Sequence, residues 1–267
     1  MTTLVVTDLD GTLWDGTLRC HADTIAAVDT LLSRDDVELL VATGRRRNSA
    51  RRGFDINGIL LPPVLLNGAT GYDFVRDQGF HEATFSPAAI AEVMGCLADN
   101  QLSPVAYLSD TRAMVVEGVT TSLPHLESLG DDLTWTTAQD LVMRTDVLGM
   151  SMLGIEQLEA EPAMQALRGV AGVEVAAYGD HLYPPYSLML APEGITKEIG
   201  IRAYLAYREL NPERIIALGD GGNDLEMLAM ADIALAVENS EPRAVAAADH
   251  LIGDPATGGW AAVLDYL

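Results

Sequence analysis

The sequence predicts an α/β fold with a Rossmann-like parallel-sheet core and an inserted α+β domain. Short apolar segments that end in polar turns alternate with helix-like segments at both ends of the chain, as parallel strands with right-handed crossovers do. The middle of the chain instead has closely spaced strand patterns. This change of pattern places the core at 1–84 and 189–267 and the insertion at 85–188.

The N-terminal part alternates strand and helix patterns. Residues 3–8 form a short, apolar, β-branched run that ends in a turn, and 37–42 form a second run of this kind. A helix is expected over 22–33, between these two strands. A third strand is expected within 59–66, where two prolines interrupt the run, so its pairing should begin after them.

The C-terminal third repeats this alternation, and the middle part has the pattern of a mixed α+β unit. The elements expected in the C-terminal third are helices at 196–209, 224–231, 241–248 and from near Gly259 to the end, with strands at 214–218 and 233–237. Those expected in the middle are a hairpin at 70–84, helices at 86–99, 122–129 and 156–168, and strands near 104–108, 113–117, 146–152, 173–177 and 186–190.

Composition narrows the classes of function. The chain has 267 residues, 49% of them hydrophobic, and a net charge of −23. Nucleic acids and anionic membranes attract basic surfaces, so neither is expected as a partner. No apolar run approaches the ~20 residues of a membrane helix. The first apolar run ends at Asp8, so a signal peptide is not expected. Cys20 and Cys96 are the only cysteines, so no disulfide framework is expected. These features predict a soluble cytoplasmic protein. We also expect a monomer or homodimer whose partner is a small molecule.

The strongest functional signal is a pair of aspartates directly after the first strand. Asp8 and Asp10 lie in the run 8–13 (DLDGTL), and Gly11 permits a sharp turn behind them. Side chains at the carboxyl end of a parallel strand open into the crevice where α/β proteins bind ligands. An ordinary Asp-Gly turn is the alternative, but the complete run after an apolar strand favours a functional site.

A second acidic loop follows another apolar strand. Asp220 and Asp224 lie in 219–224 (GDGGND), and their carboxylates suit Mg²⁺, which prefers oxygen ligands. The alternative is a structural loop whose Asn223 or Asp224 caps the next helix. Combined with the first aspartate pair, the metal interpretation is favoured. The five histidines lack the spacing of zinc ligands, so zinc is not indicated.

Three further positions complete the predicted site. Thr43-Gly44-Arg45 follows the second strand, where a hydroxyl and free backbone N–H groups can hold a phosphate, although an ordinary helix cap is the alternative. Asn67 ends the third strand. Lys197 is the only lysine among 16 basic residues. Arg45 also begins an arginine-rich run. This run is either a solvated helix face or a site at which Arg45, at least, attracts an anionic substrate.

Together these residues resemble the haloacid dehalogenase superfamily. Asp8 and Asp10 match its first motif, Thr43 its second, Lys197 its third and 219–224 its fourth, in the same order. The segment between the second and third motifs resembles the large α+β cap, type C2B, of the type IIB Cof-like phosphatases. The resemblance therefore implies a phosphatase whose inserted domain is a cap.

The resemblance also implies a role for each residue of the site. Asp8 attacks phosphorus, Asp10 protonates the leaving alcohol and then activates water, and Thr43 and Lys197 stabilise the phosphoryl charge. Mg²⁺ is expected on Asp8, the backbone carbonyl of Asp10, Asp220 and Asp224, the last of these through water. The residues expected near the bound phosphate are Gly44, Arg45, Asn67 and Asn223.

The implied activity is hydrolysis of a sugar phosphate or a similar phosphomonoester, and the rivals are a dehalogenase, a phosphosugar mutase or a non-enzymatic sensor. A dehalogenase needs neither a metal nor Asp10, so the presence of Asp10, Asp220 and Asp224 argues against it. A mutase needs arginine-rich contacts in the cap, and the cap stretch 140–155 has a single arginine, Arg144. A sensor would tolerate the loss of Asp10 or Lys197. His181, Tyr183 and Tyr186 are candidate specificity residues, although ordinary core packing is their alternative.

Overall fold

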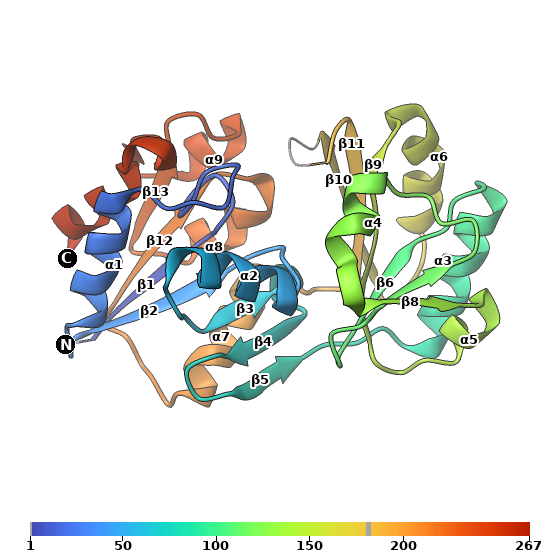
Figure 1. The fold of residues 1–267 in the computed structure, drawn as a ribbon, viewed down its shortest axis with the longest axis horizontal. Coiled ribbons are helices and arrows are strands. Elements are labelled where there is room, and N and C mark those ends of the chain that lie inside the picture. Colours follow the sequence, from blue (N-terminus) through green and yellow to red (C-terminus); the bar gives the residue numbers. More distant parts are fainter. Residues whose placement is uncertain (1, 180–182) are drawn as a thin grey trace. The chain divides into compact units, whose positions relative to one another are not determined.

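The computed structural model describes residues 2–179 and 183–267, which form two compact units (Figure 1). One unit comprises Met1–His81 and Thr196–Leu267, and the other comprises Glu82–Ile195. The boundary expected at 188 falls within strand β11 (Tyr186–Pro192), which pairs with β10 along its whole length. The strand therefore belongs entirely to the second unit, which ends later than the sequence indicated.

The first unit is built on an eight-stranded sheet whose order is β14-β13-β12-β1-β2-β3-β4-β5. Pairing is parallel from β14 to β3, and β4 runs antiparallel to β3. The strands in chain order are β1 (Thr3–Thr7), β2 (Val37–Ala42), β3 (Pro63–Leu65), β4 (Thr70–Asp73), β5 (Gln78–Glu82), β12 (Arg214–Gly219), β13 (Ile233–Val237) and β14 (His250–Ile252). This is the predicted α/β class with a mainly parallel core.

Helices cover both faces of this sheet because its central strands are apolar on both sides. Val5 of β1 faces a cluster built with α1 (Ala22–Leu32), α2 (Arg47–Asn57) and η5 (Gly259–Tyr266). Leu4 and Val6 face the opposite cluster, built with α7 (Lys197–Tyr207), α8 (Leu225–Ala229) and α9 (Pro242–Ala247). The helix expected from Gly259 is present, but as a 3-10 helix. An apolar pattern alone does not distinguish a 3-10 helix from an α-helix. Short 3-10 turns also occur at η1 (Leu66–Gly68), η3 (Gly222–Asp224) and η4 (Pro255–Thr257).

The second unit has a six-stranded sheet of order β10-β11-β9-β6-β7-β8. Helices α3 (Pro87–Asp99) and α6 (Gln157–Leu167) pack their apolar residues on it in one hydrophobic core. Its other elements are β6 (Val105–Leu108), β7 (Ala113–Val116), α4 (Leu123–Leu129), η2 (Gly130–Asp132), β8 (Leu133–Thr136), α5 (Ala138–Val142), β9 (Val147–Ile155) and β10 (Val173–Gly179). The sequence pattern missed β8 and α5, which are only four and five residues long.

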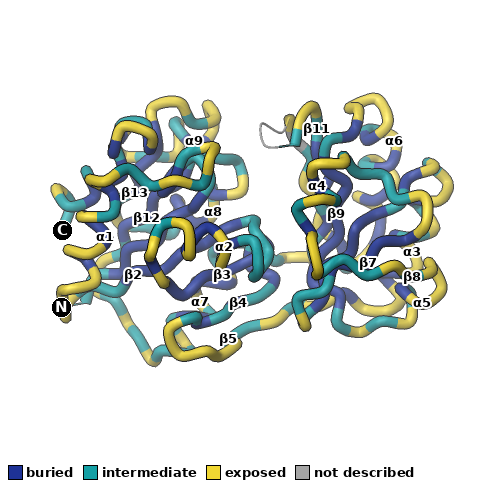
Figure 2. The backbone as a smooth tube through the Cα atoms, viewed as in Figure 1, coloured by how far each residue is buried: buried dark blue, intermediate teal, exposed yellow. Residues whose placement is uncertain are grey.

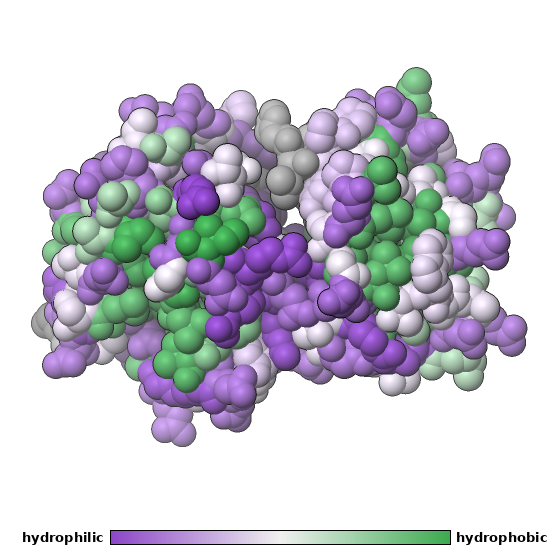
Figure 3. Space-filling view, in the orientation of Figure 1, coloured by the Kyte–Doolittle hydropathy of each residue, from purple (hydrophilic) through white to green (hydrophobic). Residues whose placement is uncertain are grey.

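Burial follows this architecture in each unit. The central strands are buried and the connecting loops are exposed (Figure 2). Hydrophilic side chains are spread over the visible surface, with hydrophobic ones between them (Figure 3). Across residues 2–179 and 183–267, no helix has both the length and the apolar character that crossing a membrane requires.

Candidate active site

The strand ends of the first unit bring the predicted acidic residues together. β1 pairs in parallel with β12 and β2, with Thr7 opposite both Leu218 and Val41. The backbone N–H of Asp8 continues this register by donating to the carbonyl of Leu218 at 2.9 Å. The residues that follow the three strands therefore meet at one edge of the sheet.

Lys197 lies between two of these carboxylates. Its Nζ donates to Oδ1 of Asp8 at 2.5 Å and to Oδ1 of Asp224 at 2.6 Å, and its side chain is fully buried. The side chain of Thr196 caps α7 by accepting from the N–H of Ile199, so α7 begins at Lys197. The cap thus fixes the backbone position from which the ammonium reaches the carboxylates.

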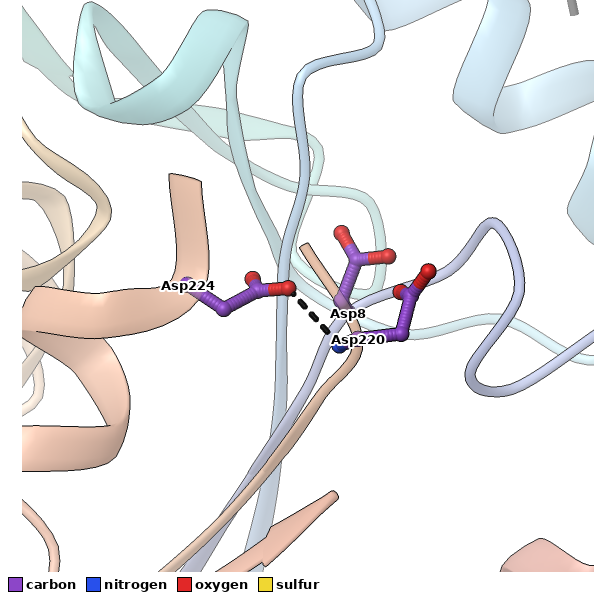
Figure 4. A group of neighbouring side chains, drawn as sticks. All are labelled: Asp8, Asp220 and Asp224. Carbon is purple, nitrogen blue, oxygen red and sulfur yellow. Dashed lines mark hydrogen bonds between the residues drawn. The ribbon is translucent and has the colours of Figure 1, made fainter. Parts of the chain in front are cut away.

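Asp224 holds the acidic loop in shape. Its Oδ2 accepts from the N–H groups of Asp220, at 3.0 Å, and Gly221, at 2.9 Å, and Figure 4 marks the first of these bonds. A Cβ at Gly219 would lie 2.6 Å from Cβ of Asp224, so this close approach requires glycine. The carboxylate that accepts from the lysine therefore also orders the backbone next to Asp220.

Asp220 is held from the first loop. The hydroxyl of Thr12, a residue without a role in the sequence analysis, donates to Oδ1 of Asp220 at 2.8 Å. Gly11 has a φ of +79°, and a Cβ there would lie 2.7 Å from Oδ2 of Asp220. Gly11 and Thr12, which directly follow Asp10, therefore position the carboxylate of Asp220.

Burial and charge shift the ionisation of this cluster. Burial raises the pKa of the Asp8 carboxyl, and the charge of Asp224 raises it further. The charge of Lys197 lowers this pKa but does not cancel the effect of burial, so the pKa stays well above its ordinary value. Burial, with the charge of Asp224, raises the pKa of Asp220 to about 7. Burial lowers the pKa of Lys197, but the charges of Asp224 and Asp8 outweigh that effect and raise it. The ammonium is therefore retained, while the carboxylates repel one another.

The same carboxylates suit a divalent cation. Asp8, Asp220 and Asp224 each offer one oxygen, and these three oxygens lie within 4.8 Å of one another. Magnesium bonds of about 2.1 Å place opposite ligands about 4.2 Å apart, which matches this spacing. Three carboxylates and one ammonium leave an excess of negative charge that a cation would balance. The donor set therefore fits Mg²⁺, with Asp224 the least available because both its oxygens accept hydrogen bonds.

The Asp10 carboxylate is held by Arg45, which lies just before α2, and by Trp14. The carboxylate accepts from Nε and Nη2 of Arg45, at 2.6 Å each, and from the indole N–H of Trp14 at 3.0 Å. Nη1 of Arg45 donates to the hydroxyl of Ser49 at 2.7 Å. The sequence predicts Arg45 at the phosphate and gives Trp14 and Ser49 no role. Its pattern does not signal the pairing of Arg45 with Asp10, which lies 35 residues away.

The other predicted phosphate contacts lie around Thr43. Thr43 is buried after β2, and its hydroxyl accepts from the N–H of Arg45 at 3.1 Å. Asn67 has a φ of +53°, and its backbone N–H donates to the carbonyl of Thr43 at 3.0 Å. Its side chain accepts from Asn223 at 2.9 Å and lies beside Gly44, where a Cβ would be 3.2 Å from its Oδ1.

The specificity candidates belong to the second unit. Tyr183 lies with its ring 5.3 Å from that of His125, and Tyr186 packs against the hydrophobic core of that unit. His181 lies outside the described residues.

A protein-family model matches nearly the whole chain. Residues 5–264 match the family model for haloacid dehalogenase-like hydrolases. The chain belongs to the haloacid dehalogenase-like hydrolase family. The resemblance seen in the sequence is thereby confirmed, and the chain is an enzyme of this hydrolase family.

Two similar proteins with phosphatase names each cover about three quarters of the chain or more. A 5-amino-6-(5-phospho-D-ribitylamino)uracil phosphatase of Bacillus subtilis, YitU, is 25% identical over 252 residues, which is 88% of this chain and 86% of YitU. A phosphoglycolate phosphatase of Natronomonas pharaonis is 27% identical over 198 residues, or 74% and 81% of the two chains.

Solved structures of this hydrolase family share the fold. A haloacid dehalogenase-like hydrolase from B. subtilis superposes with a TM-score of 0.82 at 17% identity, over 99% of both chains. The HAD subclass IIB sugar phosphatase BT4131 gives 0.77 at 20% identity, over 99% of this chain and 98% of its own. At these identities the likeness shows the fold alone.

Proposed function

We propose that this hydrolase is a magnesium-dependent phosphatase that releases phosphate from a small phosphorylated metabolite, a sugar phosphate or a similar phosphomonoester. The observation that carries the proposal is the contact of Lys197 with Asp8 and Asp224. A buried ammonium at a carboxylate nucleophile neutralises the repulsion that an incoming phosphate dianion would otherwise meet. The phosphatase names of YitU and of the N. pharaonis protein support the same reaction class.

In the proposed reaction Asp8 attacks the phosphorus atom in line, and the bond from phosphorus to the leaving oxygen breaks. The product of this first step is an aspartyl phosphate on Asp8. Asp10 gives a proton to the leaving alcohol. In the second step Asp10 takes a proton from water, the water oxygen bonds to phosphorus, and the bond from phosphorus to Asp8 breaks, which releases inorganic phosphate and regenerates Asp8. Lys197, the hydroxyl of Thr43 and the amides near Gly44 stabilise the charge on the phosphoryl oxygens.

Asp8, Asp220 and the backbone carbonyl of Asp10 would hold the magnesium ion, with Asp224 assisting through water. When bound, the ion supplies positive charge that lowers the repulsion between the nucleophile and the phosphoryl group. The raised pKa values of Asp8 and Asp220 support this assignment, because they express a mutual repulsion that a cation would relieve. Asn67 and Asn223, joined by their own hydrogen bond, would line the phosphate position.

A panel of phosphorylated metabolites, assayed for release of inorganic phosphate, tests the proposed reaction. We expect hydrolysis of several phosphomonoesters, its loss in excess chelator, and its recovery when Mg²⁺ is returned. An enzyme that keeps full activity in excess chelator would remove the metal from the proposal. If no phosphate is released from any member or from an aryl phosphate, the phosphatase assignment itself is wrong.

We also propose that Glu82–Ile195 serves as the cap that selects the leaving group. The support is its insertion between the second and third motifs, as in the Cof-like phosphatases that the sequence resembles. Joint replacement of Tyr183 and Tyr186 by alanine should reorder the preferred metabolites while sparing a small aryl phosphate, since the aryl group needs few contacts. An unchanged order would discard these two residues as determinants of specificity.

A further inference from the structure

We propose that Arg45 is a positioning residue that orients the carboxylate of Asp10 for proton transfer, and that it does not act by binding the substrate phosphate. The inference rests on the proposed function, because it assigns Arg45 a part in the acid–base step. It departs from the expectation drawn from the sequence, which placed the guanidinium on the phosphate.

The contact between the two side chains is a two-pronged ion pair. Nε of Arg45 donates to Oδ2 of Asp10 and Nη2 donates to Oδ1, both at 2.6 Å. The planar guanidinium matches the plane of a carboxylate in this geometry, so the pair fixes the direction of the carboxylate as well as its distance. The Arg45 side chain is 12% exposed and that of Asp10 is 40% exposed. The better-buried partner therefore anchors the one that faces solvent.

Arg45 is itself fixed by its surroundings. Its Nη1 donates to Ser49 on α2 at 2.7 Å, and its guanidinium lies 5.5 Å from the ring centroid of Trp14. Trp14 is fully buried and donates its indole N–H to Oδ1 of Asp10. Gly53 of α2 makes room for this ring, since a Cβ there would lie 2.4 Å from it. The two groups that donate to Asp10 therefore support each other.

This arrangement favours positioning over phosphate binding. Arginine binds phosphate through two parallel N–H groups of its fork, and in Arg45 the Nε–Nη2 edge is occupied by Asp10. Nη1 is committed to Ser49. A general acid must come within about 2.6–3.2 Å of the atom it protonates, and a misplacement of ~1 Å can cost about 10²-fold in rate. A half-exposed aspartate without these donors would sample several rotamers and be in place for only part of the time.

The test is a double-mutant cycle with Arg45→Met and Asp10→Asn, with Mg²⁺ present. On an alkyl phosphate, whose leaving group needs protonation, Arg45→Met should lower kcat by about 10-fold to 100-fold and change KM by less than about threefold. On an aryl phosphate with a good leaving group the loss should be smaller. In the Asp10→Asn background, Arg45→Met should have almost no additional effect, because the group through which it acts is already disabled.

Two outcomes would overturn the inference. A large rise in KM with unchanged kcat would place Arg45 on the substrate. Losses that multiply in the double variant would mean that Arg45 acts independently of Asp10. A wild-type enzyme that releases no phosphate would instead refute the proposed function and leave no acid–base step for Arg45 to serve.

Two further variants separate positioning from a loss of structure. Arg51→Met removes an arginine of α2, the helix that follows Arg45; Arg51 pairs with exposed Asp55, and its loss should leave kcat unchanged. Arg45→Lys keeps the charge but loses the two-pronged geometry, so it should restore folding, measured by thermal unfolding, without restoring kcat. Full activity in Arg45→Lys would show that charge alone suffices and would contradict orientation by the fork.

Discussion

Replacing Lys197 with arginine keeps the positive charge but changes its shape, which makes this substitution a sharp test of the proposed site. The ammonium is fully buried, with Oδ1 of Asp8 at 2.5 Å and Oδ1 of Asp224 at 2.6 Å. A guanidinium is a wide planar fork, and it cannot occupy this point between two carboxylates without displacing one of them. Displacement of Asp8 would move the proposed nucleophile out of line.

The expected loss can be bounded from both sides. Even a small displacement should lower kcat/KM at least about tenfold, which is ~1.4 kcal/mol of transition-state stabilisation. Removal of a whole charge-stabilising donor typically costs about 10² to 10³ in kcat, so Lys197→Ala should fall at or beyond that range. Lys197→Ala should also destabilise the fold by about 3–5 kcal/mol, because it leaves two buried carboxylates without their cation.

The assay compares kcat/KM for phosphate release with the urea midpoint of each variant. Arg202→Lys is the matched control, since Arg202 lies on the same helix and is 62% exposed beside Glu198. A folded Lys197→Arg enzyme with the kcat/KM of the wild type would refute the reasoning. Lys197 would then have no part in the proposed chemistry, however close it lies to Asp8.

Four further substitutions test other parts of the site. Asp8→Asn should abolish phosphate release, because an amide is not a nucleophile here, whereas Asp10→Asn should slow an alkyl phosphate by about 10² to 10⁴ and a good aryl leaving group less; equal losses on both substrates would remove the acid role. Asp220→Asn should stabilise the metal-free protein. The raised pKa of Asp220, about 7 against an unfolded value of 3.8, means that stability is lost as pH rises through this interval. The gain in Tm should therefore be larger at pH 8 than at pH 5, and a gain independent of pH would contradict the assignment. Gly219→Ala should cost about 1–3 kcal/mol in urea unfolding, since its Cβ would lie 2.6 Å from Asp224; a neutral result would show that the loop can shift.

The strand ends were predictable because the apolar runs are short and sharply bounded. The strand expected at 37–42 is β2 with the same limits, and the positions after β1 and β12 hold the acidic residues that the structure brings together. Parallel pairing then forces these positions to one edge. The roles of the residues there stay predictions.

Other features depend on contacts that a single sequence does not encode locally. Arg45 and Asp10 are 35 residues apart, and their pairing depends on how α2 packs against Trp14. The short edge strand β8 has too few residues for a clear period, and the tight winding of η5 is set by packing at the end of the chain. Such features arise from tertiary packing, which overrides local preference.

The position of β1 at the centre of its sheet has a consequence for the order of folding. Its neighbours are β2, which follows soon in the chain, and β12, which begins at Arg214 after the whole second unit has been made. Until β12 has been synthesised, one edge of β1 therefore stays unpaired. An unpaired apolar strand edge is prone to associate with other chains. The contact of Lys197 with Asp8 spans 189 residues and can form only after the second unit has been made. We therefore expect a chain interrupted before β12 to aggregate, and Asp8 to gain its ammonium partner only after the second unit has been made.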